Sequence, residues 1–201
     1  MTTHQEQWDG DREVWSRVQA GDREAFAIVF DRYAGAVYGH VLRRMGDPHE
    51  AEDLTSAVFL TAWRRRTDVR FDRESALPWL LGTANRTVAN SRRSLRRYRA
   101  LAERVPLPPQ VPDHADEVAR QVDGQRDAAA LRRSVERLPR HERDVVELCV
   151  WGGLDQQAAA VALGVALGTV KARMHRARKR LGGLLAEEGV RAPGGTLEES
   201  R

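Results

Sequence analysis

Cysteine is almost missing from this sequence of 201 residues, in which Cys149 is the only one. A single cysteine excludes an intramolecular disulfide, and a zinc site would have to rely on histidine or carboxylate ligands. The six histidines show no ligand spacing, so we expect no metal and no cofactor, and we interpret Cys149 as a small apolar core residue. Aromatic residues are also scarce, at 6% of the chain, whereas charged residues make up 31%. This balance favours two small helical cores over one large core.

Long hydrophobic runs are absent as well. No stretch approaches the roughly 20 apolar residues that are needed to span a bilayer. The first residues, which include His4, Glu6, Asp9 and Asp11, lack the apolar segment of a signal peptide. We therefore expect a cytoplasmic protein without membrane insertion.

The common signatures of enzymes are lacking too. The sequence contains no glycine-rich phosphate loop and no nucleophile elbow. Carboxylates such as Glu52 and Asp53 are adjacent in the chain, which does not suit a pair that acts from two sides of a cleft. The sequence therefore predicts a non-enzymatic protein with no catalytic residues.

Basic residues are present in two clusters, although the formal net charge is only +4. One cluster lies between Arg86 and Arg99 and contains no acidic residue, and the other lies between Lys171 and Arg180. Two separate basic helical faces suggest two contacts with a polyanion, and nucleic acid is the expected partner.

Apolar spacing predicts an all-α first domain over residues 22–99. Apolar residues recur every three or four positions from Phe26 to Met45, and Gly46 to Pro48 end that helix. A second helix is expected from Pro48, and a third from Pro78 to beyond Arg93. Residues 1–21 are predicted to be an N-terminal extension.

A proline-containing linker is expected to follow, over residues 100–127. It carries Pro106, Pro108, Pro109 and Pro112, a density that no packed element tolerates. At about 3 Å per residue such a linker could span on the order of 80 Å. That reach would cover two DNA sites about two helical turns, or near 70 Å, apart. A second domain is predicted over 128–188, with a disordered tail over 189–201.

The second domain contains the spacing of a helix-turn-helix. Ala160 would let two helices approach closely, Gly164 would allow the left-handed turn, and Val170 would lock the second helix onto the first. Asp155 and Thr169 are predicted to cap the two helices, the second of which would run from Val170 through Arg180. A recognition helix needs donors for base edges and phosphates, which this one would supply.

At these residues the chain resembles the extracytoplasmic-function sigma factors of bacterial RNA polymerase, which are members of the sigma-70 family. Residues 138–143, 151–154, 163–165 and 168–178 closely resemble region four, and residues 52–64 and 78–86 resemble region two. The resemblance implies a protein that binds core RNA polymerase and directs it to promoter DNA. It also implies an anti-sigma factor as a further partner.

The resemblance assigns roles to three groups of residues. Positions expected to bind core polymerase are Asp53, Leu54, Ser56, Phe59 and Leu60. Positions expected at the unwound minus-ten strand are Asn85, Arg86, Asn90, Arg92, Arg93, Arg96 and Arg97, and Asn85 and Arg86 both stay open as the base reader. Positions expected at the minus-thirty-five element are Thr169, Lys171, Arg173, His175, Arg176 and Arg178.

Two other functions are compatible with parts of the sequence. A helix-turn-helix regulator that acts without polymerase would explain residues 128–186 but leave the first hundred residues unexplained. A sigma-like protein that competes for core polymerase would explain both halves. For Phe59, simple burial is the alternative to a polymerase contact, and for Trp79 a core position is favoured over a DNA contact.

Overall fold

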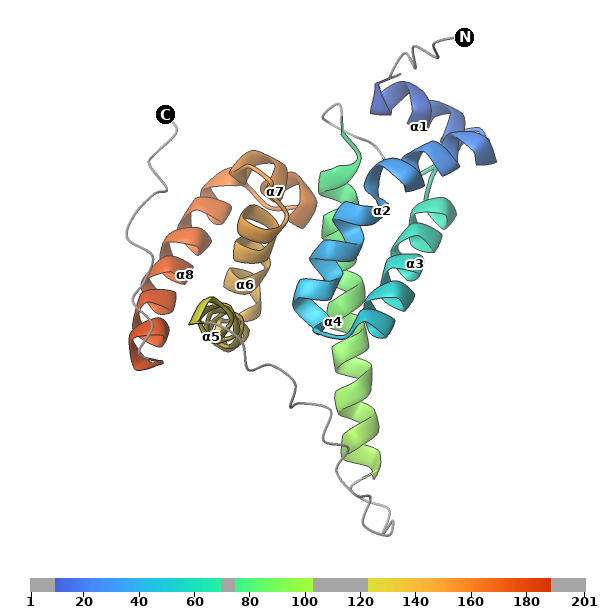
Figure 1. Ribbon diagram of the computed structural model, residues 1–201. Helices are drawn as coiled ribbons and strands as arrows, with labels where there is room; N and C mark the ends of the chain where they lie inside the picture. The colour runs from blue at the N-terminus through green and yellow to red at the C-terminus, as the bar shows by residue number, and fades with distance from the viewer. Residues whose placement is uncertain (1–9, 70–74, 103–122, 189–201) are drawn as a thin grey trace, which may run out of the picture.

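The computed structural model describes residues 10–69, 75–102 and 123–188, and every regular element in these ranges is helical (Figure 1). The first half of the chain forms α1 (Asp11–Gln19), α2 (Arg23–Met45), α3 (Pro48–Arg64) and α4 (Leu77–Ala102). The second half forms α5 (Asp123–Arg137), α6 (Arg140–Val146), the π-helical turn η1 (Glu147–Trp151), α7 (Gln156–Leu163) and α8 (Leu167–Glu187). The predicted all-α fold is confirmed.

The residues at which α2 begins and ends, and at which α3 begins, are determined by residues close by in the sequence. The Asp22 carboxylate accepts hydrogen bonds from the backbone N–H groups of Glu24 and Ala25, which would otherwise lack partners at the start of α2. Gly46 ends α2 in the left-handed region with φ of 78°, which a glycine adopts without strain. Pro48 then occupies the first turn of α3, as predicted.

Helix α1 lies inside the segment that the sequence predicted to be an extension. Val14, Trp15 and Val18 are buried in the core that α1 shares with α2. Asp11 is also buried, and its carboxylate accepts hydrogen bonds from Arg32, Tyr33 and the backbone N–H of Ala76. Residues 11–19 are therefore an integral part of the first helical unit, and the description of residues 1–21 as an extension is wrong for them.

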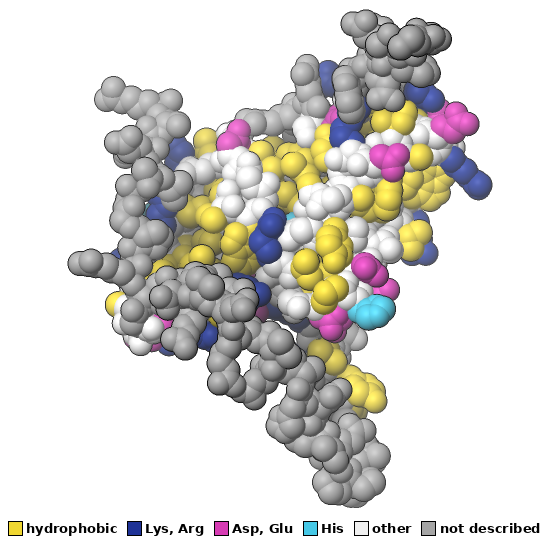
Figure 2. Space-filling model, in the orientation of Figure 1, with side chains coloured by type: hydrophobic (Ala, Val, Ile, Leu, Met, Phe, Trp, Pro, Cys, Tyr) yellow, Lys and Arg dark blue, Asp and Glu magenta, His cyan; other side chains and the backbone are white. Residues whose placement is uncertain are grey.

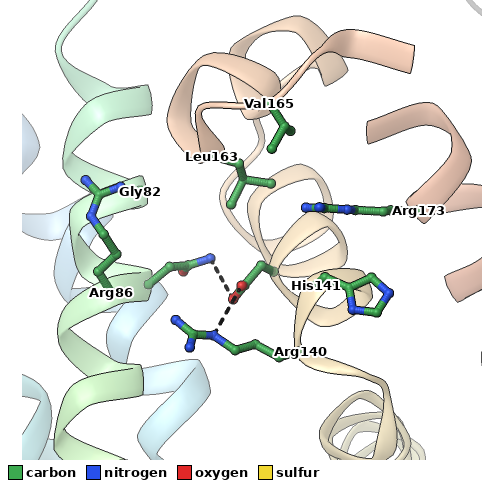
Figure 3. A pocket seen from close by; sticks show the side chains of 9 residues that line it. Gly82, Arg86, Arg140, His141, Leu163, Val165 and Arg173 are labelled. Atoms are coloured by element: carbon green, nitrogen blue, oxygen red, sulfur yellow. Dashed lines mark hydrogen bonds and ion pairs between the residues drawn. The ribbon is translucent and has the colours of Figure 1, made fainter. Parts of the chain in front are cut away.

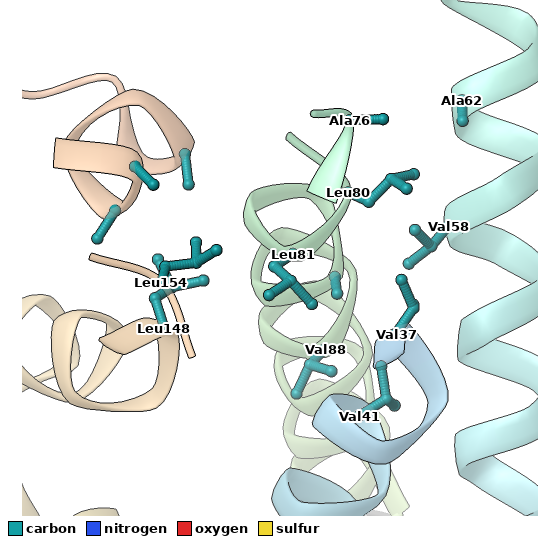
Figure 4. Close-up of a cluster of buried hydrophobic side chains, with 14 of the residues drawn as sticks. Val37, Val41, Val58, Ala62, Ala76, Leu80, Leu81, Val88, Leu148 and Leu154 are labelled. Carbon is teal, nitrogen blue, oxygen red and sulfur yellow. The ribbon is translucent and has the colours of Figure 1, made fainter. Parts of the chain in front are cut away.

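Helix α4 runs through the centre of the molecule. Leu80, Ala84 and Val88 on one side pack toward α2 and α3, as Figure 4 shows for Leu80 beside Val58. Leu81 faces the other way, toward Leu148 and Leu154 of the second half (Figure 4). The C-terminal part of α4 projects beyond the other helices of the first unit (Figure 1).

The second half packs its short helices around α8. Val135 and Leu138 are buried, as is Val145, whereas Val150 in the π-helical turn is 54% exposed. Cys149 is half-buried against the core, and burial raises the pKa of its thiol to about 11, so the thiol stays protonated. Helix α5 begins at Asp123, five residues before the start predicted for the second domain. The predicted linker and the predicted tail lie mostly outside the described residues.

The two halves share one hydrophobic core, because α7 packs directly on α4. Figure 2 shows hydrophobic side chains (yellow) on one face of the molecule, interspersed with basic side chains (dark blue). Among the helices in the described ranges, none combines the length and the apolar character that a membrane crossing requires.

Candidate nucleic-acid interface

Helices α7 and α8 form the predicted helix-turn-helix. Gly164 ends α7 in the left-handed region with φ of 65°, and Ala160 and Val170 are buried between the two helices. The carboxylate of Asp155 caps α7 by accepting from the N–H of Ala158 at 2.6 Å. These four positions have the roles that the spacing indicated.

The start of the recognition helix differs from the prediction. Helix α8 begins at Leu167, because Ala166 already has the extended backbone of an N-cap residue, with ψ of 147°. Thr169 therefore lies within the first turn, and its prediction as the cap is wrong. The helix also continues past Arg180 to Glu187.

Removal of the one side-chain cap in this motif gives a testable effect on stability. We expect Asp155→Ala to lower the free energy of unfolding by about 1 kcal/mol, because the N–H of Ala158 loses its partner. Urea denaturation would measure this loss. Asp155→Asn is the matched control, since its amide oxygen can still accept the bond, and equal losses in the two variants would contradict the capping role.

The recognition helix presents a basic surface on one side and an apolar surface on the other. Val170, Met174 and Ala177 are buried against the rest of the second half. The predicted DNA-contacting residues Lys171, His175, Arg176 and Arg178 are exposed, and Thr169 and Arg173 are half-buried. No acidic residue occurs in α8 before Glu187. An arrangement of this kind can contact phosphates and base edges.

Glu142 holds the recognition helix from behind and was not found from the sequence. Its side chain is only 1% exposed, yet it forms ion pairs with Arg176 at 3.4 Å and with Arg180 at 3.1 Å. Both arginine side chains are about half exposed. Their ion pairs with Glu142 hold them on the side of α8 that faces α6. The only indication in the sequence is that Glu142 lies in the first turn of α6, where an acidic side chain is favoured.

The second basic surface is formed by α4. Asn90, Arg93, Arg96 and Arg97 are exposed along its C-terminal half, and α4 contains no acidic residue. Arg86 is exposed too and donates a hydrogen bond to Thr83 Oγ1 at 3.0 Å. Partial burial, together with the positive charge of Arg65, lowers the pKa of Arg86. Of the loop at residues 70–76 before this helix, 70–74 are outside the described residues.

Asn85 differs most from its predicted role as a base reader. Its side chain is buried, and its Oδ1 accepts from His40 Nε2 at 2.7 Å. Its Nδ2 donates to Asp144 Oδ1 at 3.4 Å. Both ends of the amide are thus used inside the protein, so the prediction of Asn85 as an accessible reader is wrong for this structure.

The guanidinium of Arg92 is also hydrogen-bonded within the protein. Its guanidinium donates to the backbone carbonyl of Arg44 and to Glu136 Oε1, the latter at 3.2 Å. Glu136 belongs to α5, so this predicted phosphate contact instead links the two halves of the chain. In this arrangement the phosphate role is left to the exposed arginines of α4.

The predicted polymerase-binding positions lie on α3 and divide into two groups. Asp53 and Ser56 are exposed, Leu54 is half-buried, and Leu60 is 55% exposed. Phe59 is only 3% exposed and packs against Phe26 and Phe30, with ring centroids 6.3 and 4.7 Å away. The prediction of Phe59 as an exposed contact is wrong, because the two aromatic rings of α2 enclose it. Trp79 is half-buried against the core.

A basic hollow of about 460 Å³ lies where the two halves meet (Figure 3). Gly82 and Arg86 line it from α4, whereas Arg140 and His141 line it from α6 and Arg173 from α8. Residues predicted to contact the two different promoter elements, Arg86 and Arg173, thus border the same space.

Comparisons with known proteins match both halves. The family model described as Sigma-70 region 2 matches residues 29–98, and the one described as Sigma-70, region 4 matches residues 128–181. The ECF RNA polymerase sigma factor SigK of Mycolicibacterium vanbaalenii is 32% identical over 79% of this chain and 80% of its own length. The ECF RNA polymerase sigma factor RpoE of Cereibacter sphaeroides is 30% identical over 80% of this chain and 86% of its own.

Solved structures share the fold. The structure of CnrH in complex with the cytosolic domain of CnrY matches with a TM-score of 0.63 at 23% identity, covering 89% of this chain and 99% of that one. The sigma factor RpoE of Bartonella quintana, in complex with the anti-sigma factor NepR, matches with a TM-score of 0.58 at 20% identity, covering 80% of this chain and 96% of that one.

The region 2 match accounts for the part of the chain that a polymerase-independent regulator would leave unexplained. Relatives at 30% identity or more match over most of their own length. The chain therefore belongs to the extracytoplasmic-function sigma factors, the non-enzymatic subunits that direct bacterial RNA polymerase to promoters.

Proposed function

We propose that the exposed basic side chains of α8 bind the major groove of the minus-thirty-five element. The observation that carries this proposal is that α4, and α8 as far as Glu187, present exposed basic side chains and contain no acidic residue. Lys171 is exposed near the start of α8, where a recognition helix meets base edges. The half-buried Arg173 and the exposed Arg176 are the companion contacts.

Helix α4 holds the unwound minus-ten strand in this proposal. Separation of a duplex costs a few kcal/mol for each unstacked step, and contacts with the displaced strand recover that cost. Arg93, Arg96 and Arg97 are placed to neutralise phosphates, which adds affinity without sequence information. Arg86 and Asn90 are the accessible candidates for base contacts.

The exposed side of α3 is the proposed docking surface for core polymerase. Leu60 is the most exposed large apolar side chain of that helix, and half-buried Leu54 precedes it by six residues. Asp53 and Ser56 supply a polar rim beside them. An apolar centre with a polar rim is the usual composition of a protein interface. We place the protein in the cytoplasm, where polymerase and promoter DNA are found, with an anti-sigma factor as its further partner.

Run-off transcription with purified core polymerase tests this function. The wild-type chain should start transcripts at a specific site, which a competitor for core polymerase would not do. We expect Lys171→Ala to weaken binding of the minus-thirty-five duplex about tenfold, the lower end of the loss for a base contact, and to reduce transcript yield. Electrophoretic mobility shift at several salt concentrations would measure the affinity.

Lys179→Ala is the matched control for this variant. Lys179 is exposed on the same helix but lies outside the predicted contacts, so its loss should alter affinity little. Equal effects of the two substitutions would contradict the assignment of Lys171. If wild-type protein and active core polymerase together start no specific transcript, the proposed function itself is refuted.

A further inference from the structure

The basic hollow between the two halves is lined by residues from several helices. Arg86 of α4 and Arg173 of α8 approach it from opposite sides, and Arg140 of α6 approaches it from a third side (Figure 3). Leu163 and Val165, at the turn of the helix-turn-helix, form an apolar wall at the top of the view (Figure 3). The volume of about 460 Å³ lies within the range of about 300–1,000 Å³ in which proteins bind small molecules. The hollow therefore has the size and the mixed lining of a ligand site.

Positive charge exceeds negative charge in this lining. Three guanidinium groups face one carboxylate, that of Asp144, which leaves a net charge of +2 when His141 is neutral. The Asp144 side chain is only 13% exposed and is also shared with Arg44, at 3.7 Å. Charges of one sign in a concave site attract counter-ions, because the protein walls concentrate the electric field. The hollow thus favours an anion.

The three arginines of the hollow have few partners within the protein. Arg173 is half-buried and forms no hydrogen bond or ion pair with any residue that the structure describes. Among the same residues Arg86 donates only to Thr83 of its own helix, at 3.0 Å, and partial burial lowers its pKa. Arg140 lies 3.7 Å from Asp144, a separation too long for a hydrogen bond. A guanidinium carries five donors, so each of these side chains keeps donors for a ligand.

Guanidinium groups that converge from several sides suit a phosphate better than a carboxylate. A phosphate presents three acceptor oxygens in different directions, whereas the two oxygens of a carboxylate lie in one plane. Arginine also binds phosphate through paired hydrogen bonds and stacks on aromatic rings. The apolar wall of Leu163 and Val165 adds a surface for a ring system beside the phosphates. A nucleotide combines these two parts in one small molecule.

We propose that the basic hollow is a binding site for a small phosphorylated ligand of the nucleotide class, with Arg86, Arg140 and Arg173 as its phosphate-binding residues. The phosphates lie among the three guanidinium groups, and the base lies against Leu163 and Val165. Both halves of the chain supply lining residues, so the site is complete only in the intact protein.

A bound nucleotide also affects promoter binding, a consequence that rests on the proposed function. Arg86 and Arg173 are proposed contacts of the two promoter elements, and an arginine that holds a phosphate of the ligand is not available to DNA. Ligand and promoter DNA therefore compete, and each lowers the affinity for the other by the same factor. The site is thus a means by which a small molecule reduces transcription.

Isothermal titration calorimetry of the full chain with ATP, pyrophosphate and adenosine tests the site. We expect ATP to bind, pyrophosphate to bind more weakly, and adenosine, which lacks phosphate, to give no signal. Arg140→Gln should weaken ATP binding about tenfold or more, because charge-assisted hydrogen bonds are lost. The Arg140 side chain is 56% exposed, so this substitution should leave the fold intact. Arg173→Gln is a second variant, on a different helix, with the same expected loss.

Lys179→Gln is the matched control. It removes one positive charge from α8, as Arg173→Gln does, but Lys179 is exposed and does not line the hollow. Its substitution should change ATP affinity little, whereas general attraction to basic surfaces would weaken equally in both variants. An equal loss, or no ATP binding up to about 1 mM, would overturn the proposed site. Equal affinities for ATP and pyrophosphate would overturn the assignment of a nucleotide.

Promoter DNA separates this inference from the proposed function. In fluorescence anisotropy, ATP at about ten times its dissociation constant should weaken the binding of a labelled minus-thirty-five duplex about tenfold. The same ATP concentration should have less effect on Arg140→Gln, since Arg140 lies outside the proposed promoter contacts. ATP binding that leaves DNA affinity unchanged would overturn the competition. If no duplex is bound and no transcript forms, the proposed function fails, whereas calorimetry still reports on the hollow.

Discussion

Arg44→Met is expected to destabilise the protein by about 3–5 kcal/mol at pH 8, the usual cost of removing one partner from a buried ion pair. Arg44 lies between Glu147 at 3.1 Å and Asp144 at 3.7 Å, and its side chain is 3% exposed. Without the guanidinium, the buried Glu147 carboxylate would lose its ion-pair partner and would keep only the weaker influence of Arg143 and Arg92. The protein can relieve this carboxylate only by separating its two halves or by taking up a proton. Urea denaturation at pH 8 and pH 6 would measure the loss, which should be smaller at pH 6.

A double substitution separates the loss of the pair from the loss of a side chain. Arg44→Met combined with Glu147→Leu removes both charges, and apolar replacement of a whole buried pair is often close to neutral. We therefore expect the double variant to be more stable than Arg44→Met alone. Arg43→Met is the matched control on the same helix, because Arg43 makes one hydrogen bond, to the carbonyl of Trp151, and should cost only about 1 kcal/mol. A double variant as unstable as the single one would contradict this description.

The second large effect concerns pH. Burial lowers the pKa of His40 to about 4, and it raises the pKa of Glu147 to about 7 although Arg44 acts in the opposite direction. Between pH 4 and 6.5 the unfolded chain therefore binds a proton at His40 that the folded protein excludes. Stability from His40 is present above this window and is lost as the pH falls through it. Stability from Glu147 is present below pH 4.5 and is lost as the pH rises through 7.

Between about pH 4.5 and 6.5 the contribution of His40 to the free energy of unfolding rises with pH, whereas that of Glu147 falls. The two changes oppose each other in the wild-type protein, so its pH dependence alone does not reveal either of them. Each amounts to about 1.4 kcal/mol per pH unit. The free energy of unfolding of wild type minus that of Glu147→Gln should fall by about 3 kcal/mol from pH 4.5 to 7. The difference between wild type and His40→Gln should rise over pH 4 to 6.5. Urea denaturation across this range gives both curves, and two flat difference curves would contradict the burial of these groups.

The surroundings of both groups make this pH range specific to the contact between the two halves of the chain. Arg44 faces both residues, Arg43 and Asn85 lie beside His40, and Asp144 and Arg143 lie beside Glu147. Burial also raises the pKa of Asp144, although the neighbouring arginines oppose this shift. Groups that a substitution leaves unchanged contribute equally to the stability of the wild type and of the variant at each pH. Their titration therefore cancels in the difference between the two curves.

Features that depend on neighbouring residues could be predicted from the sequence. Gly46, Asp155 and Gly164 end or begin helices at the expected positions, because a cap or a left-handed turn is determined within a few residues. The helix-turn-helix spacing also predicted correctly that Val170 is buried. Thr169 was misplaced because Ala166 begins the helix without any side-chain cap.

Features that depend on a second packing partner could not be predicted. Periodicity assigns one buried side to a helix, whereas α4 is covered on one side by α2 and α3 and on another by α7. Asn85 lies on that second buried side, so an amide that the family resemblance placed at DNA is enclosed. Phe59 was ambiguous for a similar reason, since only the packing of α2 decides whether its ring is covered. Glu142 needed the position of α8 before its two arginine partners could be known.

The shared hydrophobic core makes the stability of each half depend on the other. Leu81 of α4 faces Leu148 and Leu154 of the second half, and these contacts exist only when both halves are folded. Loss of one half would expose apolar side chains of the other to water, at a cost in free energy that grows with the exposed area. Neither half therefore reaches in isolation the stability that it has in the intact chain.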